Sequence, residues 1–545
     1  MNAANRVFSF LVLLIATTAV ASVTGSISGT VSDPAGAVIP GVSVIAVNDE
    51  TGVRHEVFSD QKGFYSFLAL PVGTYAVTVH KAGFRESRET GIVIDANSAI
   101  RVDVRLEVGG VHEEMTISSS AVHVETTTTQ MGEVIGSSKM QSLPLNGRSY
   151  TDLLALQPGV APETSGEYQP ISPSASLNAG GLSVSGQRET ANGFMVNGGN
   201  VNEGVNQTTA IVPNLDSIEE FRIITNNFDA EYGNYSGGQV NAITKSGTND
   251  FHGELFEFLR NDDLDARNYF SNIREAFKQN QFGGTFGGPV VRKKIFFFVD
   301  YQGTRQIQGQ VANLPVYSAA DLTGNLADAA SALTGAVNGS YWAGVLSSEL
   351  GYPVTNGESY YAPGCATSSG CVFPNAIIPQ VAISAPAKAL LKYIPPPNTS
   401  EDGQPFYETG AYNNVLRDDK GGARIDGSSR AGMLSAYYFI DDYHQQCPYC
   451  FVSLPGFEVL NIGRAQMINL SDIKTQSATA VNELRLHYMR FATFTGEPVG
   501  GVGPSLSSLG FVTGANTLGI VPIAPQFDAP STEATELCEP VQWDA

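Results

Sequence analysis

A short apolar run at the start of the chain limits the fold of everything that follows it. Arg6 precedes an apolar run from Val7 to Ala16, and Ala19-Val20-Ala21 supplies the small residues that a signal peptidase requires. Residues 1–21 are therefore predicted to be a secretory signal peptide. The run is too short for a spanning helix, which needs about 20 apolar residues, and no other uninterrupted apolar stretch of that length follows. If the mature chain enters a membrane, it must do so as β-strands, because lipid offers no partner for unpaired backbone groups.

The charge of the chain argues against nucleic acid as a partner. The sequence has 53 acidic and 31 basic side chains, which gives a formal net charge of -22. Binding to a phosphate backbone needs a basic face, and this balance does not supply one. Hydrophobic residues make up 42% of the chain, which is enough for folded domains, and 57 Gly with 28 Pro predict many turns.

Five cysteines fit an exported protein in an oxidising compartment. Cys365 and Cys371 lie in a Gly- and Ser-rich stretch, and Cys447 and Cys450 enclose a Pro-Tyr pair, which leaves Cys538 over. The second pair has the spacing of a redox dithiol and resembles the glutaredoxin motif. That chemistry requires a helix N-terminus in a βαβ frame, and neither flank predicts one. Two local loop disulfides are the alternative that we favour.

Residues 25–108 predict an all-β sandwich. Short β-rich runs alternate with turn residues at close intervals, and in one of them Tyr75, Val77 and Val79 share a face. The predicted strands are Gly25–Ser32, Val42–Val47, Val53–Ser59, Phe64–Phe67, Gly73–Val79 and Ala99–Leu106.

Three motifs in this segment resemble the carboxypeptidase regulatory-like domain, which is a transthyretin-like sandwich. They are residues 63–67 (GFYSF), residues 70–75 (LPVGTY) and Gly83-Phe84. The resemblance implies a fold but no activity, because a fold does not fix function. Carbohydrate binding and a role as a spacer or docking module both remain open.

The next segment carries an ordered set of motifs. They are residues 143–148 (LPLNGR), 153–160, 183–188, 194–198 (FMVNG), 217–223 and 232–245. In this order they resemble the plug domain of TonB-dependent outer-membrane receptors, most closely the Oar-like type. The resemblance implies a small α/β plug at residues 119–248, folded inside a barrel. Gly233, Gly237 and Gly238 lack a Cβ atom and let the backbone turn sharply or approach a wall closely.

Residues 109–118 are predicted to be a linker. Their alternation of polar and apolar residues suits β-augmentation, in which a peptide adds itself to the edge of another sheet, but an ordinary interdomain linker explains the same pattern. The resemblance places a candidate TonB box here, although a Met stands where the family usually has Val. The residues of the candidate box are Glu113, Glu114, Met115, Thr116 and Ile117.

The rest of the chain, residues 249–545, predicts barrel strands with long loops. Val299 and Tyr301 alternate with Asp300 and Gln302, and residues 483–488 alternate in the same way. One apolar and one polar face is what a transmembrane barrel strand requires, although a half-buried strand of a soluble sheet shows it too. Residues 290–294 predict a short periplasmic turn, and residues 305–375 predict a long surface loop. The predicted fold class is mainly β: sandwich, plug, then the first part of an antiparallel barrel.

The part of the chain that remains for the barrel is too short to close it. If the barrel begins near Phe251, 295 residues remain, whereas a plugged transporter barrel has about 22 strands of roughly 10 residues plus loops. We therefore expect a barrel that is truncated in this chain and does not transport by itself.

The sequence predicts neither an enzyme nor a cofactor. It has no H-E-x-x-H pair, Walker A loop, G-x-S-x-G elbow or matched C-x-x-C pairs. The pairs Asp262-Asp263 and Asp441-Asp442 could bind a cation in a loop, but we expect them to be solvated loop carboxylates.

The resemblance implies a receptor or transporter in the outer membrane of a Gram-negative cell, with the sandwich in the periplasm. Its implied partners are a TonB-type energy-transducing protein, outer-membrane lipid, and a large ligand such as an oligosaccharide or a peptide. The alternative is a cell-surface carbohydrate-binding or adhesion protein that uses the sandwich.

Overall fold

The structure is a computed structural model, and it describes most of the chain. The described residues are 23–109, 114–118, 130–143, 145, 148–162, 181–204, 209–228, 232–267, 274–310, 313–330, 333–401, 404–408, 412–429, 432–447, 459–477, 480–496, 507–510, 535–538 and 542–544. The predicted signal peptide, Glu113 and Cys450 lie outside these ranges.

Residues 25–105, together with residues 114–118, form a sandwich of two sheets around one core. One sheet has the order β3-β2-β5-β6-β9, and in the other β1 pairs with β4, β7 and β8. The strands are β1 (Gly25–Ser32), β2 (Ser43–Asn48), β3 (Arg54–Phe58), β4 (Phe64–Leu70), β5 (Gly73–His80), β6 (Glu86–Ile94), β7 (Ala99–Arg101), β8 (Val104–Arg105) and β9 (Glu114–Ser118). Tyr75, Val77 and Val79 lie in this core with Ile27 and Val44, so the predicted period of two is confirmed on β5. Strand β6 was not predicted.

The second unit is a small sheet with the order β10-β15-β16-β13-β14. Its strands are β10 (Met131–Gly136), β13 (Gly193–Val196), β14 (Gly199–Asn200), β15 (Ile218–Asn226) and β16 (Gln239–Thr244), with the short helices α2 (Ser137–Ser142) and α3 (Thr151–Leu154) and the hairpin of β11 (Val160–Pro162) and β12 (Leu182–Val184) beside it. All of β16 is buried. Gly237 allows a close approach, since a Cβ there would lie 2.9 Å from the carbonyl oxygen of Ala191.

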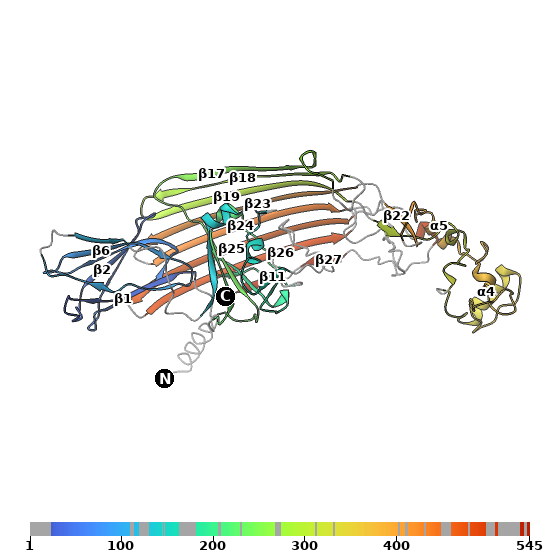
Figure 1. Ribbon diagram of the computed structural model, residues 1–545, viewed down its shortest axis with the longest axis horizontal. Coiled ribbons are helices and arrows are strands. Elements are labelled where there is room, and N and C mark those ends of the chain that lie inside the picture. Colours follow the sequence, from blue (N-terminus) through green and yellow to red (C-terminus); the bar gives the residue numbers. More distant parts are fainter. Residues whose placement is uncertain are drawn as a thin grey trace, which may run out of the picture.

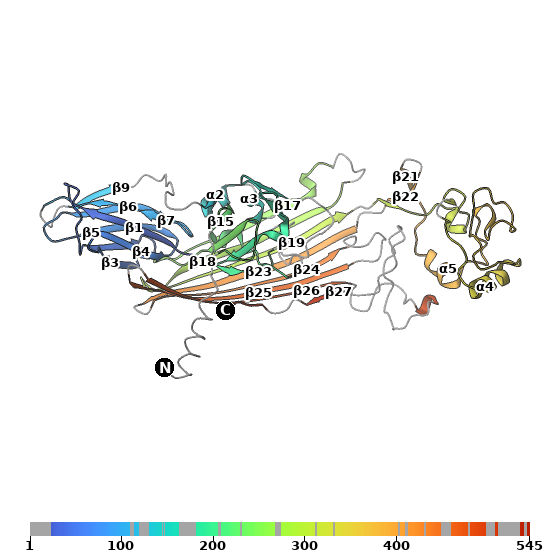
Figure 2. The same cartoon turned by 90° about the horizontal axis from the view of Figure 1, so that it is seen from below.

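The third unit is a large antiparallel sheet of long strands with the order β17-β18-β19-β23-β24-β25-β26-β27, and β28 also pairs with β26. Its strands are β17 (His252–Asn261), β18 (Phe277–Val291), β19 (Ile295–Gln310), β23 (Tyr412–Ser429), β24 (Gly432–Cys447), β25 (Val459–Ser477), β26 (Ala480–Gly496), β27 (Thr535–Cys538) and β28 (Gln542–Asp544). Among the described strands this sheet is open, and it runs from β17 to β27. The second unit, which we call the plug, lies against one face of this sheet, as Figures 1 and 2 show.

The two faces of the large sheet differ in polarity as predicted. On β26, Leu484 and Leu486 point outward and are about half exposed, whereas Arg485 and His487 point inward and are less than one-tenth exposed. On β19, Asp300 likewise lies on the inner face. An apolar outer face and a largely polar inner face are the pattern of a barrel in lipid. The inner face of β24–β26 also carries an apolar patch, including Phe439, Met467 and Phe491, that packs against the core of the second unit.

The connections define the two ends of the sheet. Three residues join β18 to β19, and two residues join β23 to β24 and β25 to β26, all at the end where the sandwich lies (Figure 1). At the other end 11 residues separate β24 from β25, and 101 residues separate β19 from β23. Barrels of the outer membrane have short periplasmic turns and long outer loops, so the sandwich lies at the periplasmic end.

Residues 313–401 are a folded module at the outer end rather than the long surface loop predicted for residues 305–375 (Figure 2). The module has its own small core of Val337, Ala343, Val354, Val372 and Phe373. Its elements are β20 (Asn313–Pro315), α4 (Ser340–Leu350), α5 (Ala385–Leu391) and β21 (Thr399–Glu401), and β22 (Gln404–Glu408) pairs with β20 and β21. No helix among the described residues is long and apolar enough to cross a membrane.

Candidate functional site

The barrel wall holds the plug at the tip of the β13–β14 hairpin. Asn197 and Gly198 both have positive φ, 50° and 75°, as a two-residue type I′ turn requires. The Asn469 side chain of β25 donates to the Asn197 carbonyl at 2.9 Å, and the Arg485 guanidinium of β26 donates to the Gly198 carbonyl at 3.1 Å. Both donors lie on the inner face, so two strands of the wall satisfy the carbonyls of one plug turn.

A second contact joins the wall to a buried plug segment, residues 209–217. The Lys420 ammonium of β23 donates to the Val212 carbonyl at 3.3 Å. The Asn214 side chain donates to the Asp300 carboxylate of β19. Within the plug, Asp216 pairs with Arg148, whose guanidinium lies 4.0 Å above the ring of Phe258 on β17. Cation–π contact of this kind strengthens away from water.

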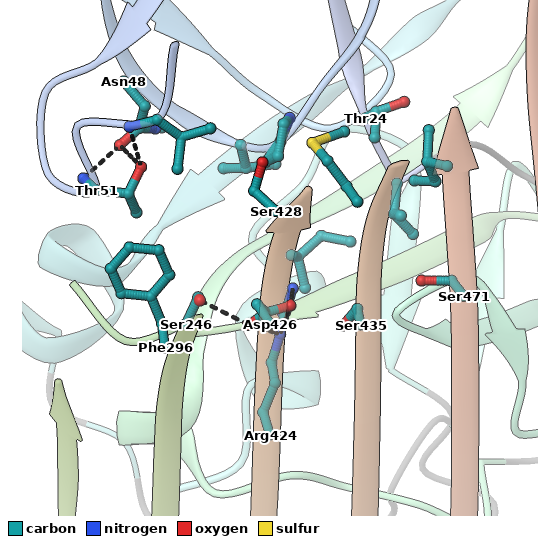
Figure 3. A pocket seen from close by; sticks show the side chains of 18 of the residues that line it. Thr24, Asn48, Thr51, Ser246, Phe296, Arg424, Asp426, Ser428, Ser435 and Ser471 are labelled. Atoms are coloured by element: carbon teal, nitrogen blue, oxygen red, sulfur yellow. Dashed lines mark hydrogen bonds and ion pairs between the residues drawn. The ribbon is translucent and has the colours of Figure 1, made fainter. Parts of the chain in front are cut away.

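A third contact lies near the periplasmic rim. The Arg424 guanidinium of β23 donates to the Thr244 carbonyl at 2.5 Å and pairs with Asp426 at 2.9 Å. The Ser246 hydroxyl donates to the same carboxylate at 2.6 Å. The end of plug strand β16 is therefore tied to β23, as Figure 3 shows for Ser246, Arg424 and Asp426.

A cavity of about 170 Å³ lies where the sandwich, the plug and the barrel rim meet. Thr24 and Asn48 of the sandwich face Ser435 and Ser471 of the barrel across it (Figure 3). Several of its polar groups are already bonded to other groups of the protein. Asn48 accepts from the Thr51 amide and hydroxyl, both at 2.9 Å, and Ser246 and Arg424 both bond to Asp426. The cavity is therefore a gap between three units.

The sandwich also contacts the plug through the turn between β6 and β7, residues 95–98. The Ala96 amide donates to the Glu220 carboxylate of β15 at 2.5 Å, and the Ala96 carbonyl accepts from the Arg222 guanidinium at 3.0 Å. Burial raises the pKa of Glu220 to about 8, and the nearby Asp95 and Glu219 carboxylates act in the same direction, whereas the Ala96 hydrogen bond lowers it.

The candidate TonB box lies on the sandwich. Residues Glu114–Ser118 form β9, which runs parallel to β6 with Glu114 opposite Glu86 and Ser118 opposite Thr90. The segment thus adds itself to the edge of a sheet of its own chain. Glu113 lies outside the described residues, and the role of the box as a partner-binding segment remains a proposal.

The predicted cysteine pairs fall in two places. The structure joins Cys365 and Cys371 by a disulfide in the outer module. Cys447 ends β24, and Cys450 lies outside the described residues, so the second pair stays a prediction.

One prediction about acidic pairs is wrong. Asp441 lies within β24 and is fully buried on the inner face opposite Lys420, so it is not a solvated loop carboxylate. Asp418, two residues before Lys420, is buried on the same face. Inward residues of a barrel strand recur at every second position, as Asp418 and Lys420 do. Arg417 and Asp419 between and beside them are charged as well, so the sequence shows no alternation of polar and apolar residues that could have placed them in the lumen.

A family model described as an outer membrane beta barrel domain matches residues 243–542, which is more than half of the chain. The chain belongs to this family of outer-membrane β-barrel proteins. A second model, the carboxypeptidase regulatory-like domain, matches residues 26–107. These matches confirm the predicted location in the outer membrane and the predicted resemblance of the sandwich.

One curated relative is the TonB-dependent transporter Oar of Myxococcus xanthus, 27% identical over 278 residues. The match covers 48% of this chain and 25% of the relative, so the chain spans about a quarter of the relative's length. The predicted Oar-like resemblance is thereby confirmed.

Two solved structures are similar at low identity. The outer membrane transporter YddB from Escherichia coli is 11% identical with a TM-score of 0.41, and the match covers 68% of this chain and 40% of that one. The siderophore receptor PirA from Acinetobacter baumannii is 14% identical with a TM-score of 0.33, covering 70% of this chain and 51% of that one.

Proposed function

We propose that this protein takes part in TonB-dependent transport of a large substrate across the outer membrane. In this proposal a TonB-type energy-transducing protein binds residues 113–117 in the periplasm, and its pull rearranges the plug. The substrate, an oligosaccharide or a peptide, binds at the outer end near the module of residues 313–401. The Oar relative, itself a TonB-dependent transporter, supports the proposal.

The observation that carries the proposal is how the plug is held. Side chains of the wall, including Lys420, Arg424, Asn469 and Arg485, donate to backbone carbonyls of the plug at separate places. The plug core also packs against apolar side chains of β24, β25 and β26, among them Phe439, Met467 and Phe491. The polar contacts beside this apolar patch can be exchanged for water one at a time. Rearrangement of the plug would therefore have to separate the apolar patch as well as exchange these hydrogen bonds.

Binding of the partner tests the proposal. The full chain in detergent micelles is titrated with the purified C-terminal domain of a TonB-type protein, and the dissociation constant is measured by calorimetry. Thr116→Pro should weaken binding at least about tenfold, because proline removes a strand N–H that β-augmentation uses. Thr116→Val keeps that N–H and is the matched control. If the unsubstituted chain does not bind the domain, the proposed function is wrong.

The alternative, a cell-surface carbohydrate-binding or adhesion protein, gains no support from the arrangement. The sandwich lies beside the short turns, since the Asn249 amide at the start of the barrel donates to the Glu50 carbonyl at 3.1 Å. That end faces the periplasm, away from surface glycans.

A further inference from the structure

We propose that the sandwich is a mechanical link through which tension on residues 114–118 reaches the plug. The inference rests on the proposed function, because it requires a partner that pulls on these residues. Strand β6 connects the two ends of this link. It pairs with β9 along one edge, and its last residue leads directly into the turn that contacts the plug.

The turn after β6 is held in shape by several hydrogen bonds. Asn97 has a φ of 56°, and the Ser98 amide donates to the Asp95 carbonyl at 3.1 Å. The Ser98 hydroxyl accepts from the Asp95 amide at 3.1 Å, and the Ser98 carbonyl accepts from the Ser26 amide of β1 at 2.8 Å. The turn is therefore braced by its own hydrogen bonds and by the first strand of the sandwich.

Buried polar side chains of the plug form hydrogen bonds with this turn. Glu220 and Arg222 stand two residues apart on one face of β15, each about 5% exposed or less, and they bond the amide and the carbonyl of Ala96. We call this contact the Ala96 clamp. Away from water a hydrogen bond is electrostatically stronger, and breaking one leaves a buried polar group unpaired. The Asn97 side chain adds a bond to the Gln130 side chain at 3.1 Å, just before β10.

The clamp acts on a strand inside the plug sheet. Strand β15 pairs with β10 on one side and with β16 on the other, so moving β15 disturbs both neighbours. The sandwich has a second attachment at the barrel rim, where the Asn249 side chain donates to the Thr51 carbonyl and the Asn249 amide to the Glu50 carbonyl. The rim contact would serve as a pivot, and the clamp would move the plug. The cavity lined by Glu50, Thr51 and Glu219 lies where the three units meet.

The covalent route from the box to the plug is longer. Residues 119–129 separate β9 from Gln130, and a chain of this length spans about 40 Å when extended. In the proposal, tension on β9 is carried by β6 and the clamp rather than by that segment, so the plug opens from the β15 side.

Pulling on single molecules distinguishes the two routes. The full chain sits in a lipid nanodisc fixed through its scaffold protein, and a handle attached to an azide-bearing residue in place of Ser118 is pulled with tweezers. The measured quantity is the extension at which the plug begins to lengthen. Twelve Gly and Ser residues inserted after Thr126 lengthen the linker by about 40 Å. If the sandwich carries the load, the chain with the insertion and the chain without it should open at the same extension. If the linker carries the load, the insertion should raise the opening extension by about 40 Å, and this result would overturn the proposal.

A second variant removes the clamp. Glu220→Leu with Arg222→Met should delay plug lengthening by tens of Å, because only the linker then carries the load. Glu133→Leu is the control, since Glu133 on neighbouring β10 makes an exposed ion pair with Lys139. Equal opening extensions for the clamp variant and the unsubstituted chain would also overturn the proposal. In this experiment the handle applies the force in place of the partner. The measurement therefore does not depend on binding of the TonB-type domain, and a failure of that binding would disprove only the proposed function.

Discussion

At the scale of single residues, Glu220 couples the docking of the sandwich to pH. Its carboxyl group is buried against Ala96, beside Asp95, Glu219 and Arg222, and burial raises its pKa to about 8 from an ordinary 4.5. The folded chain therefore prefers the protonated acid, and the stability that this preference contributes is fully present below pH 4.5 and is lost as the pH rises through about 8. Because the turn at Ala96 contacts Glu220, part of this dependence should appear in docking of the sandwich.

We therefore expect sandwich docking to weaken as the pH rises from 4.5 to 8, by at most about tenfold per pH unit. The distance between spin labels at Lys62 and Gln476 reports the docked fraction in the full chain. Glu220→Gln keeps an acceptor for the Ala96 amide but does not ionise, so this variant should dock equally at both pH values. Equal pH dependence in the two proteins would show that another group is responsible.

A second residue-scale prediction concerns two glycines at the edge of the plug sheet. A Cβ atom at Gly132 would lie 2.0 Å from the Ile223 carbonyl oxygen, whereas a Cβ at Gly136 would meet no atom within 4 Å. Gly132→Ala should destabilise the pairing of β10 with β15 by about 1–3 kcal/mol, as overpacking does. Gly136→Ala should have little effect, and equal effects of the two changes would contradict the structure. Hydrogen exchange of residues 131–136 and 218–226 measures the difference.

At the scale of elements, the sequence predicted strands best where one face is apolar. Strand β1 has the predicted bounds, Gly25–Ser32, because its alternation is regular and Asp-Pro-Ala-Gly ends it. Strand β6 was missed because Glu86, Arg88 and Glu89 crowd its first half, and pairing with β5 rather than its own pattern makes it a strand. The outer module was missed for a similar reason. Its small core comes from scattered residues that show no period.

The outer faces of the barrel strands carry the next prediction. Leu486 is 52% exposed and pairs across strands with Leu470, which is also outward. Leu486→Arg should cost about 2–4 kcal/mol if the position lies near the bilayer midplane, because lipid does not solvate the guanidinium. Leu486→Met is the control, since it stays apolar at similar volume. Urea unfolding in lipid vesicles compares the two, and equal stability would mean that this face does not meet lipid.

At the scale of the whole molecule, the plug site could be predicted only as a domain. The motif FMVNG, which includes Asn197 and Gly198, was one of those that predicted the plug, but the side chain that binds its turn, Asn469, lies 272 residues away. Such pairs depend on how the barrel wall curves around the plug. The alignment of wall residues with plug residues cannot be read from a single sequence. The same holds for Ala96 and Glu220, 124 residues apart, so the contact between sandwich and plug had no sequence signal.

The direction of the whole molecule in the membrane gives the last prediction. Short turns place the sandwich in the periplasm, and long connections place the module of residues 313–401 outside. Ser348 on α4 and Lys62 in the sandwich are both exposed, so each accepts a cysteine without loss of packing. Ser348→Cys should react in intact cells with a maleimide too large to cross the outer membrane, above the background of the unsubstituted chain. Lys62→Cys should react only after the membrane is permeabilised. Labelling of Lys62→Cys in intact cells would reverse the assigned direction and would move the Ala96 clamp to the side that no TonB-type partner reaches.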